Sequence, residues 1–248
     1  IFADDLGYGD VGIYGQKKIP TPNIDRMARE GMMFTSFYAG STVCSPSRAS
    51  LLTGLTTGHA PIRGNREVLP EGQSPLPQAA KTIATLLKVD AGYRTAAFGK
   101  WGLGFTTSEG NPNWKGFEEF FGYICQRQAH DYFPDHLWHN QARVDYPENL
   151  SADVTYSAPL IHQKALEYIK SADPKQPFFM YLPYTLPHGD VIVPHDELYH
   201  EFVKKFNEPP VPENRRIKRS YNFTDEPYPH AAFAAMITRL DQYVGDII

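Results

Sequence analysis

The chain has 248 residues, of which 42% are hydrophobic and 21% are charged, and both values are ordinary for a globular protein. Its 24 Lys and Arg against 28 Asp and Glu give a net charge of −4, which argues against a general nucleic-acid binder, since such proteins present a basic surface. The two cysteines cannot form a disulfide framework, and no apolar run reaches the roughly 18 residues that a membrane span requires.

Apolar periodicity, followed in chain order, predicts an alternation of strands and helices. Residues 1–3 are typical of the end of a buried strand. Thr21 is expected to cap the first helix, with Pro22 at its first position. Residues 105–150 are expected to be rich in loops, and residues 190–228 to be polar and irregular. Helices are predicted over 21–31, 46–53, 81–91, 152–172 and 231–248, and strands over 33–38, 94–98 and 177–182.

This alternation predicts an α/β fold with a mostly parallel sheet flanked by helices. Such sheets carry their sites at the carboxyl ends of the strands. Polar side chains follow three of the predicted strands, namely the pair Asp4 and Asp5, then Lys100, then His188. We therefore expect them to meet at one edge of the sheet. The chain begins without Met and stops inside an apolar run, so we expect one domain that is truncated at both ends.

Cys44 lies just before a predicted helix whose first turn holds Pro46. The free N–H groups at a helix N-terminus stabilise anions, and Arg48 adds a fixed fork of donors one turn further on. This arrangement predicts an activated thiol beside an anion site. The alternative is a buried structural cysteine near a helix start.

The same segment carries a family resemblance. Cys44-Ser45-Pro46-Ser47-Arg48, followed by Ala49-Ser50-Leu51-Leu52-Thr53-Gly54, is similar to the signature of the type I (formylglycine-dependent) sulfatases, of arylsulfatase type. Four further segments resemble landmarks of that family and come in its order: Ala3-Asp4-Asp5-Leu6-Gly7-Tyr8-Gly9-Asp10, Thr21-Pro22-Asn23-Ile24-Asp25, Gly99-Lys100-Trp101-Gly102-Leu103-Gly104 and Pro187-His188.

The resemblance implies an alkaline-phosphatase-like fold, with residues 1–248 as the N-terminal part of a single catalytic domain. It implies that a formylglycine-generating maturation enzyme oxidises Cys44 to formylglycine (3-oxoalanine). One hydroxyl of the hydrated aldehyde would attack the sulfur of a sulfate ester, and the other would release the sulfate. The implied substrate is an aryl sulfate or, more specifically, a sulfated sugar or glycan.

The resemblance also assigns the site residues. Asp4 and Asp5 would hold a metal beside Cys44, and carboxylates are the ligands of Ca²⁺ or, alternatively, Mg²⁺. Further metal ligands, an Asp-Asn pair, are expected beyond Ile248. Arg48 would orient the nucleophile, Lys100 would contact a sulfate oxygen, and His188 would contact the sulfate or the bridging oxygen.

One residue departs from the family pattern. Many members carry histidine, a candidate acid for the leaving alcohol, where this chain has Gly102. We expect His130, in an aromatic loop, to bind substrate and to take part of that task, with an ordinary loop histidine as the alternative.

Three alternatives stay open. The protein could be a phosphomonoester or phosphonate hydrolase of the same fold, a non-catalytic pseudo-sulfatase that binds sulfated glycan, or an acidic structural domain. A basic cluster at 215–219 could meet a sulfated polyanion or form a solvated loop. The family implies export to the periplasm, the outside of the cell or a lysosome-like compartment, and a signal region would lie upstream of this chain.

Overall fold

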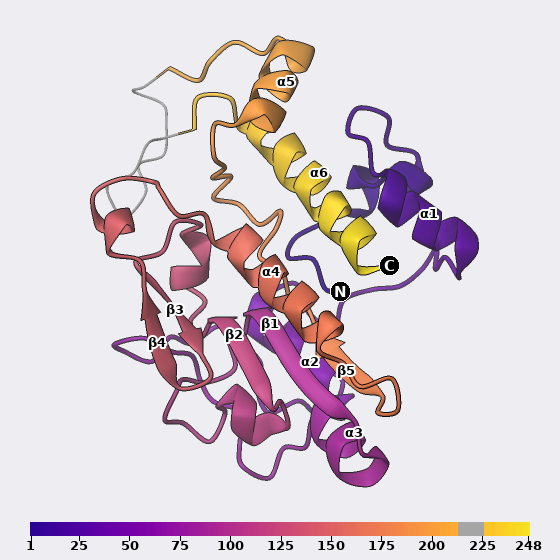
Figure 1. Cartoon of the computed structure of the whole chain (residues 1–248), viewed down its shortest axis with the longest axis vertical. Helices are drawn as coiled ribbons and strands as arrows, with labels where there is room; N and C mark the ends of the chain where they lie inside the picture. The colour runs from indigo at the N-terminus through magenta and orange to yellow at the C-terminus, as the bar shows by residue number, and fades with distance from the viewer. Residues whose placement is uncertain (213–225) are drawn as a thin grey trace.

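The computed structural model describes residues 1–212 and 226–248. The basic cluster at 215–219 lies outside the described residues. A single five-stranded sheet forms the centre, with the strand order β4-β3-β2-β1-β5 (Figure 1). In the part of the chain that the structure describes, no helix is long and apolar enough to cross a membrane.

Three adjacent strands, β2, β1 and β5, are parallel, and an antiparallel hairpin extends the sheet beyond β2. β1 (Arg94–Lys100) pairs in parallel with both β2 (Glu119–Tyr123) and β5 (Phe178–Tyr181). β3 (His136–His139) pairs antiparallel with β2 and with β4 (Ala142–Asp145). The α/β class with helices flanking a sheet is therefore confirmed, and the hairpin is an addition that the sequence analysis did not anticipate.

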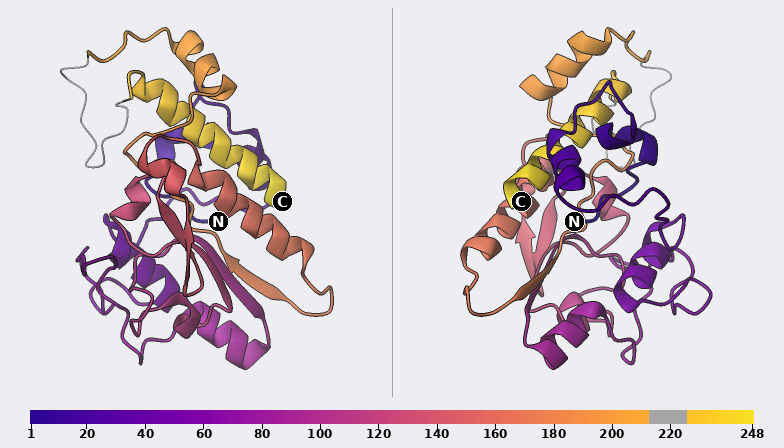
Figure 2. Two further views of the ribbon diagram at one scale, coloured as in Figure 1. Left: turned by 60° about the vertical axis from the view of Figure 1, so that its left-hand side comes forward. Right: turned by 90° about the vertical axis from the view of Figure 1, so that its right-hand side faces the viewer.

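Helices cover both faces of this sheet (Figure 2). The helices of the described residues are α1 (Pro22–Glu30), α2 (Cys44–Thr53), α3 (Ile83–Ala91), α4 (Ser157–Lys170), α5 (Glu197–Phe206) and α6 (Pro229–Ile247), and α1 and α5 pack on α6. Short 3-10 turns lie at Tyr8–Asp10, Gly12–Tyr14, Pro112–Lys115, Gln128–His130 and Pro147–Leu150.

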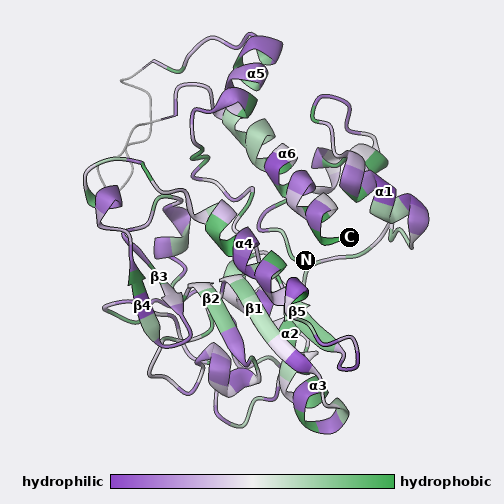
Figure 3. Cartoon of the chain, in the orientation of Figure 1, coloured by the Kyte–Doolittle hydropathy of each residue, from purple (hydrophilic) through white to green (hydrophobic). Residues whose placement is uncertain are grey.

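The alternation of side chains along β1 separates two hydrophobic clusters. Ala96 and Phe98 belong to the cluster formed with α4 and α6, whereas Ala97 belongs to the cluster formed with α2 and α3. Successive side chains of a strand point to opposite faces, so a strand covered on both sides is apolar throughout. Figure 3 shows the hydrophobic colour running along β1 and β2. Packing on both faces therefore holds β1 in place up to Lys100, its last residue.

The first helix is capped from a distant part of the chain. The Thr21 side chain makes no cap, contrary to the prediction; its hydroxyl accepts from Gly12 N and donates to Asp25. Instead the carboxylate of Asp241 in α6 accepts from the backbone N–H groups of Asn23 and Ile24, at 3.0 and 2.8 Å. Asp241 is buried, and α1 is thereby tied to α6.

Several predicted bounds were wrong. Residues 33–38 form no strand and carry exposed side chains, and the helix predicted over 152–172 begins only at Ser157. The segment 105–150, expected to be loops, holds β2, β3 and β4, and the irregular segment 190–228 holds α5. The helix start at Asp196, whose side chain accepts from Tyr199 N, was missed.

Candidate active site

The carboxyl ends of three segments lie side by side at one edge of the sheet. Phe2 N donates to Leu182 O at 2.8 Å, and Asp4 N donates to Leu186 O at 3.1 Å. Lys100 N, at the end of β1, donates to Pro183 O at 2.8 Å. The backbone thus places Asp4, Lys100 and the segment leading to His188 together, as expected for the carboxyl edge of parallel strands.

A buried carboxylate with two buried cations forms the centre of this site. Asp4 Oδ2 accepts from Lys100 Nζ at 2.7 Å and lies 3.2 Å from Arg48 Nη2. Lys100 and Arg48 are fully buried. Burial alone would raise the pKa of Asp4, but the charges of Arg48 and Lys100 outweigh it and hold that pKa below its ordinary value. The three groups form a compact set of charges with little access to water.

Arg48 is fixed by packing as well as by charge. Its Nη1 donates to the carbonyl oxygen of Lys100, and its guanidinium lies 5.4 Å from the centre of the Phe2 ring. Among residues 1–212 and 226–248, its buried Nε has no hydrogen-bond partner. An unpaired buried donor costs free energy unless a bound group satisfies it.

Cys44 is the first residue of α2, so the helix begins two residues earlier than predicted. Its Sγ is half-buried and lies 3.5 Å from Lys100 Nζ. Burial raises the pKa of the thiol, but a hydrogen bond with His188 and the charge of Lys100 outweigh it, and the pKa lies below its ordinary value. This environment is typical of a reactive cysteine position and differs from that of Cys125, which is fully buried.

His188 completes the cluster from the segment after β5. Its Nε2 lies 3.4 Å from Asp5 Oδ2, and its carbonyl oxygen accepts from the Tyr132 hydroxyl at 2.9 Å. Burial lowers the pKa of His188, whereas the contact with Cys44 and the nearby carboxylates raise it more, so the net pKa is raised. The His188 ring therefore binds a proton more readily than the ring of a free histidine.

His130 is also brought into the site. Its ring stacks on that of His188, with the centroids 4.5 Å apart and the planes 24° apart. Burial and the positive charges of Lys100 and His188 lower the pKa of His130 to about 4. This pKa favours the neutral ring at neutral pH, and a role of His130 toward the leaving alcohol stays a prediction.

Several side chains of the site carry atoms that can bind a metal ion. Donor atoms of Asp4, Cys44 and His188 lie within 4.8 Å of one another. Asp5 follows in a left-handed turn with φ 60°, and its side chain is 63% exposed. Two carboxylates suit a hard divalent cation, but Ca²⁺ takes six to eight oxygens, so Asp4 and Asp5 would supply only part of its coordination sphere. The residues fit such an ion in kind, and they would hold it beside Cys44.

Second-layer residues that position the site were not identified from the sequence. Asn65 Oδ1 accepts from Ser45 N at 2.9 Å, and the Ser45 hydroxyl donates to Gly102 O at 2.8 Å. Gln126 Nε2 donates to the same hydroxyl at 2.9 Å. These residues lie between 20 and 81 positions from Ser45, so no local pattern could have joined them.

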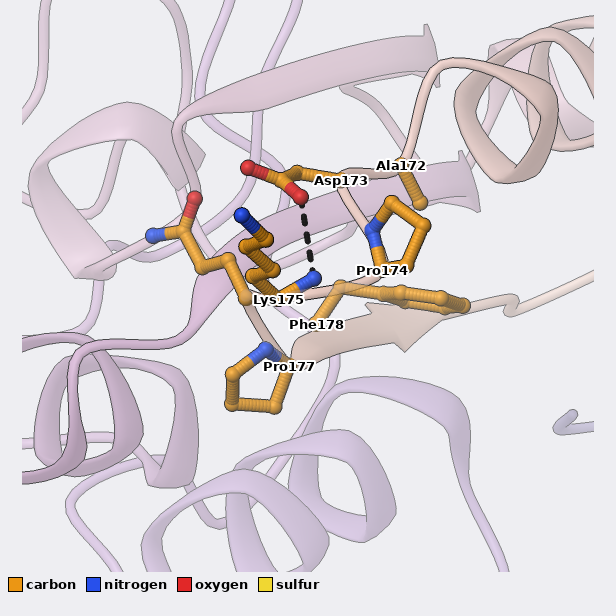
Figure 4. A pocket seen from close by; sticks show the side chains of 7 residues that line it. Ala172, Asp173, Pro174, Lys175, Pro177 and Phe178 are labelled. Atoms are coloured by element: carbon orange, nitrogen blue, oxygen red, sulfur yellow. Dashed lines mark hydrogen bonds between the residues drawn. The ribbon is translucent and has the colours of Figure 1, made fainter.

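A hollow elsewhere on the molecule is not part of this site. A pocket of about 420 Å³ lies at the turn between α4 and β5. Figure 4 shows the side chains that line it. Asp173 and Lys175 are the charged residues of its lining, and the Asp173 carboxylate accepts from Lys175 N at 2.9 Å. The hollow lies at the amino end of β5, away from the edge where Asp4 and Lys100 meet.

Comparisons with known proteins agree with this geometry. A family model described as Sulfatase matches residues 1–248. The chain is 36% identical over 210 residues to N-acetylgalactosamine-6-sulfatase of Sus scrofa, which covers 77% of this chain and 39% of that protein. It is 34% identical over 213 residues to arylsulfatase G of Mus musculus, covering 73% and 39%. The chain thus spans about two fifths of the length of these curated relatives.

Solved structures show the same fold. The crystal structure of Ps i-CgsB in complex with k-i-k-neocarrahexaose superposes with a TM-score of 0.75 at 30% identity, covering 99% of this chain and 52% of that one. A phosphonate monoester hydrolase of Agrobacterium radiobacter, at 19% identity and a TM-score of 0.60, covers 99% and 57% and shares the fold. Together with the match over the whole chain, these findings show that the chain belongs to the sulfatase family.

Proposed function

We propose that this protein hydrolyses sulfate esters and that Cys44 is the position of the nucleophile. The observation that carries the proposal is the placement of Cys44 Sγ 3.5 Å from Lys100 Nζ, which in turn lies 2.7 Å from Asp4 Oδ2. A half-buried nucleophile position beside two fully buried cations suits an anionic ester, because fixed cations offset the charge that develops on its oxygens.

The buried cations bind and orient the sulfate in this proposal. Arg48 offers its unpaired Nε, and the Lys100 ammonium, which contacts Asp4 and Cys44, directs its charge toward a sulfate oxygen. His188 holds a proton beside Cys44 and contacts the sulfate or the bridging oxygen. His130 binds substrate as a neutral ring and keeps the His188 ring in place by stacking.

Two groups complete the proposed chemistry. Oxidation of Cys44 to formylglycine would supply a hydrated aldehyde, in which one hydroxyl attacks sulfur and the other expels sulfate. Asp4 and Asp5 would hold a divalent cation, which we propose is Ca²⁺ with Mg²⁺ as the alternative, and its charge would neutralise sulfate oxygens. The overall reaction consumes one water and yields the alcohol and inorganic sulfate.

We further propose a sulfated sugar or glycan as the substrate, with aryl sulfates as surrogates. The names of the relatives support this choice, since one is an N-acetylgalactosamine-6-sulfatase and another was solved in complex with k-i-k-neocarrahexaose. The same family relation supports three accompanying proposals: maturation of Cys44 by a formylglycine-generating enzyme, export from the cytoplasm, and a single catalytic domain that contains residues 1–248.

Mass spectrometry combined with turnover tests the proposal. The tryptic peptide from Glu30 to Arg48, taken from protein made in its native host, should carry the aldehyde mass at Cys44. The protein should release 4-nitrophenol from 4-nitrophenyl sulfate, and Cys44→Ala should lower kcat by about 1,000-fold or more, because the nucleophile is lost. Cys125→Ala is the matched control, since Cys125 is fully buried, contacts Gly72 and Gln73, and should leave kcat unchanged.

Other results would favour the alternatives. Faster cleavage of an aryl phosphonate or phosphate than of the sulfate would indicate a phosphorus-ester hydrolase. An intact thiol, together with binding of sulfated sugar and no turnover, would indicate a pseudo-sulfatase. Turnover that survives Cys44→Ala would overturn the assignment of the nucleophile.

A further inference from the structure

A second hollow, which the proposed mechanism does not use, lies between the N-terminal segment and the pair α5 and α6. Its volume is about 840 Å³, within the range of sites for small ligands. Lys17 and Lys18 line one side, Lys205 and Phe206 of α5 another, and Phe233 of α6 a third. Figures 1 and 2 show the N-terminal segment running beside α6 in each view.

The turn that carries Lys17 and Lys18 is built firmly. The Gln16 side chain accepts from the backbone N–H groups of Lys18 and Ile19, and its Nε2 donates to Ile19 O at 2.7 Å. Lys205 Nζ donates to Lys18 O at 2.9 Å and ties the turn to α5. The lysines therefore extend from a fixed backbone.

The lysines of this hollow outnumber its carboxylates. Lys17, Lys18 and Lys205 line it together with Asp10 and Glu208, and within the described ranges no carboxylate forms an ion pair with these lysines. Asp10 accepts from Gly7 N at 2.9 Å, and Glu208 accepts from Ala231 N at 2.9 Å and contacts His230 Nδ1 at 2.6 Å. The hollow consequently favours an anion.

The hollow also lies close to the candidate active site along the chain. Gly9, part of its lining, is only four residues after Asp5, so their Cα atoms are at most about 15 Å apart. The rings of Phe206 and Phe233 give it apolar surface, on which the face of a sugar can pack. A sulfated saccharide combines negative charge with apolar ring faces and therefore suits this lining.

We infer that this hollow is a second binding site for the same sulfated glycan, in which the lysines hold an anionic sugar residue while another residue lies at Cys44. The inference rests on the proposed function for the identity of the ligand. It explains how the protein would prefer a polyanionic chain over a monosaccharide, because only the chain can occupy both places.

Binding and kinetics on one pair of variants test the inference. The probes are a chondroitin 6-sulfate hexasaccharide, the same hexasaccharide after chemical desulfation, and sodium sulfate. Wild-type protein should bind the sulfated hexasaccharide at least threefold more tightly than the desulfated one. The double variant Lys17→Gln/Lys18→Gln should weaken that binding about tenfold at low salt, since it removes two screened charge contacts, and should leave kcat and KM for 4-nitrophenyl sulfate unchanged.

Lys175→Gln is the matched control, because Lys175 is an exposed lysine that lines the other hollow and should change neither value. The inference fails if wild type does not prefer the sulfated hexasaccharide or if the double variant binds it as wild type does. It also fails if sodium sulfate binds with the same dependence on Lys17 and Lys18 and the hexasaccharide shows no advantage. Absence of 4-nitrophenyl sulfate turnover, with binding dependent on these lysines, would overturn the proposed function and leave the binding site standing.

Discussion

Gly102 makes room for a buried glutamine behind the candidate nucleophile. Gly102 has φ 71°, in the left-handed region, and a Cβ built there would lie 2.1 Å from Gln126 Nε2. Gln126 is 4% exposed and bonds to the hydroxyl of Ser45, the residue after Cys44. A side chain at position 102 would therefore displace the group that supports the first turn of α2.

This interlock gives a prediction for a double-mutant cycle. Gly102→Ala should lower the free energy of unfolding by about 2–4 kcal/mol, from backbone strain of about 1–2 kcal/mol and the displaced Gln126 side chain. In a Gln126→Ala background the same substitution should cost only the backbone strain. Denaturant unfolding of the four proteins measures the coupling, and strictly additive costs would show that the two residues do not interact.

Asp4, Lys100 and His188 lie together as predicted. The residues that hydrogen-bond to the backbone around them were not predicted. Asp4, Lys100 and His188 each follow a strand-like segment, so the rule for parallel sheets brings them to one edge. Asn65 positions that edge through one hydrogen bond to Ser45 N, and the Tyr132 hydroxyl through two, to the carbonyl oxygens of Thr185 and His188. Nothing in their local sequence distinguishes them from other polar loop residues.

At the scale of elements, the β3–β4 hairpin is attached to Glu71, in the loop between α2 and α3, through His136 and Trp138. His136 Nε2 lies 2.9 Å from Glu71 Oε2, and its Nδ1 lies 2.8 Å from Asp135 Oδ1. Trp138 Nε1 donates to the other Glu71 oxygen, and Arg143 contacts the other Asp135 oxygen. Burial lowers the pKa of His136, but the two carboxylates raise it more, so the net pKa is raised.

This attachment should weaken as the pH rises. Because the pKa in the folded state lies above the unfolded value of about 6.5, the stabilisation is complete below that value and is lost as the pH passes upward through the folded pKa. At pH 6, His136→Ala should lower the free energy of unfolding by about 2–3 kcal/mol, through the loss of two charge-assisted hydrogen bonds. Urea unfolding at pH 6 and pH 9 should show a smaller difference at the higher pH. An equal difference at both would contradict the raised pKa.

Elements with strong helical periodicity were predicted well, and strands within the aromatic segment were not. The helices α3 and α6 follow apolar stripes, and α3 ends at Gly92 with φ 69° as its sequence indicates. Residues 33–38 alternate weakly and find no partner strand, so propensity alone could not make them a strand. The sequence did not predict β2 because Gly122, with φ 146°, interrupts the apolar pattern of that strand. In the structure Gly122 lies so close to the backbone of Gly99 that a Cβ would not fit.

At the scale of the whole molecule, the site is assembled from segments that are far apart in the sequence. The contact between Lys100 and Asp4 joins residues 96 positions apart, and His188 comes from beyond β5. A metal held by Asp4 and Asp5 would bind the folded protein and not the unfolded chain. Its binding free energy would therefore add to the stability of the complete fold.

Removal of divalent metal should lower the melting temperature. At a Ca²⁺ concentration 100 times Kd the folded state gains about 2.7 kcal/mol, which corresponds to a rise of about 5–10 °C for a chain of this size. Asp5→Asn should abolish that rise and leave the metal-free melting temperature unchanged, since Asp5 is exposed and Asn tolerates its left-handed φ. Calorimetry with EDTA and with added Ca²⁺ or Mg²⁺ measures both values. A rise that persists in Asp5→Asn would remove Asp5 from the proposed ligands.

The attachment of α1 to Asp241 also has a consequence for synthesis on the ribosome. The N–H groups that begin α1 lie 217 and 218 positions before the carboxylate that accepts from them. At translation rates of about 5–20 residues per second, roughly 10–40 s pass between the emergence of α1 and that of its cap. During this interval only water can satisfy the start of α1, so the nascent N-terminal segment cannot consolidate before α6 is made. A stalled or shortened translation product would expose this segment to proteases and chaperones.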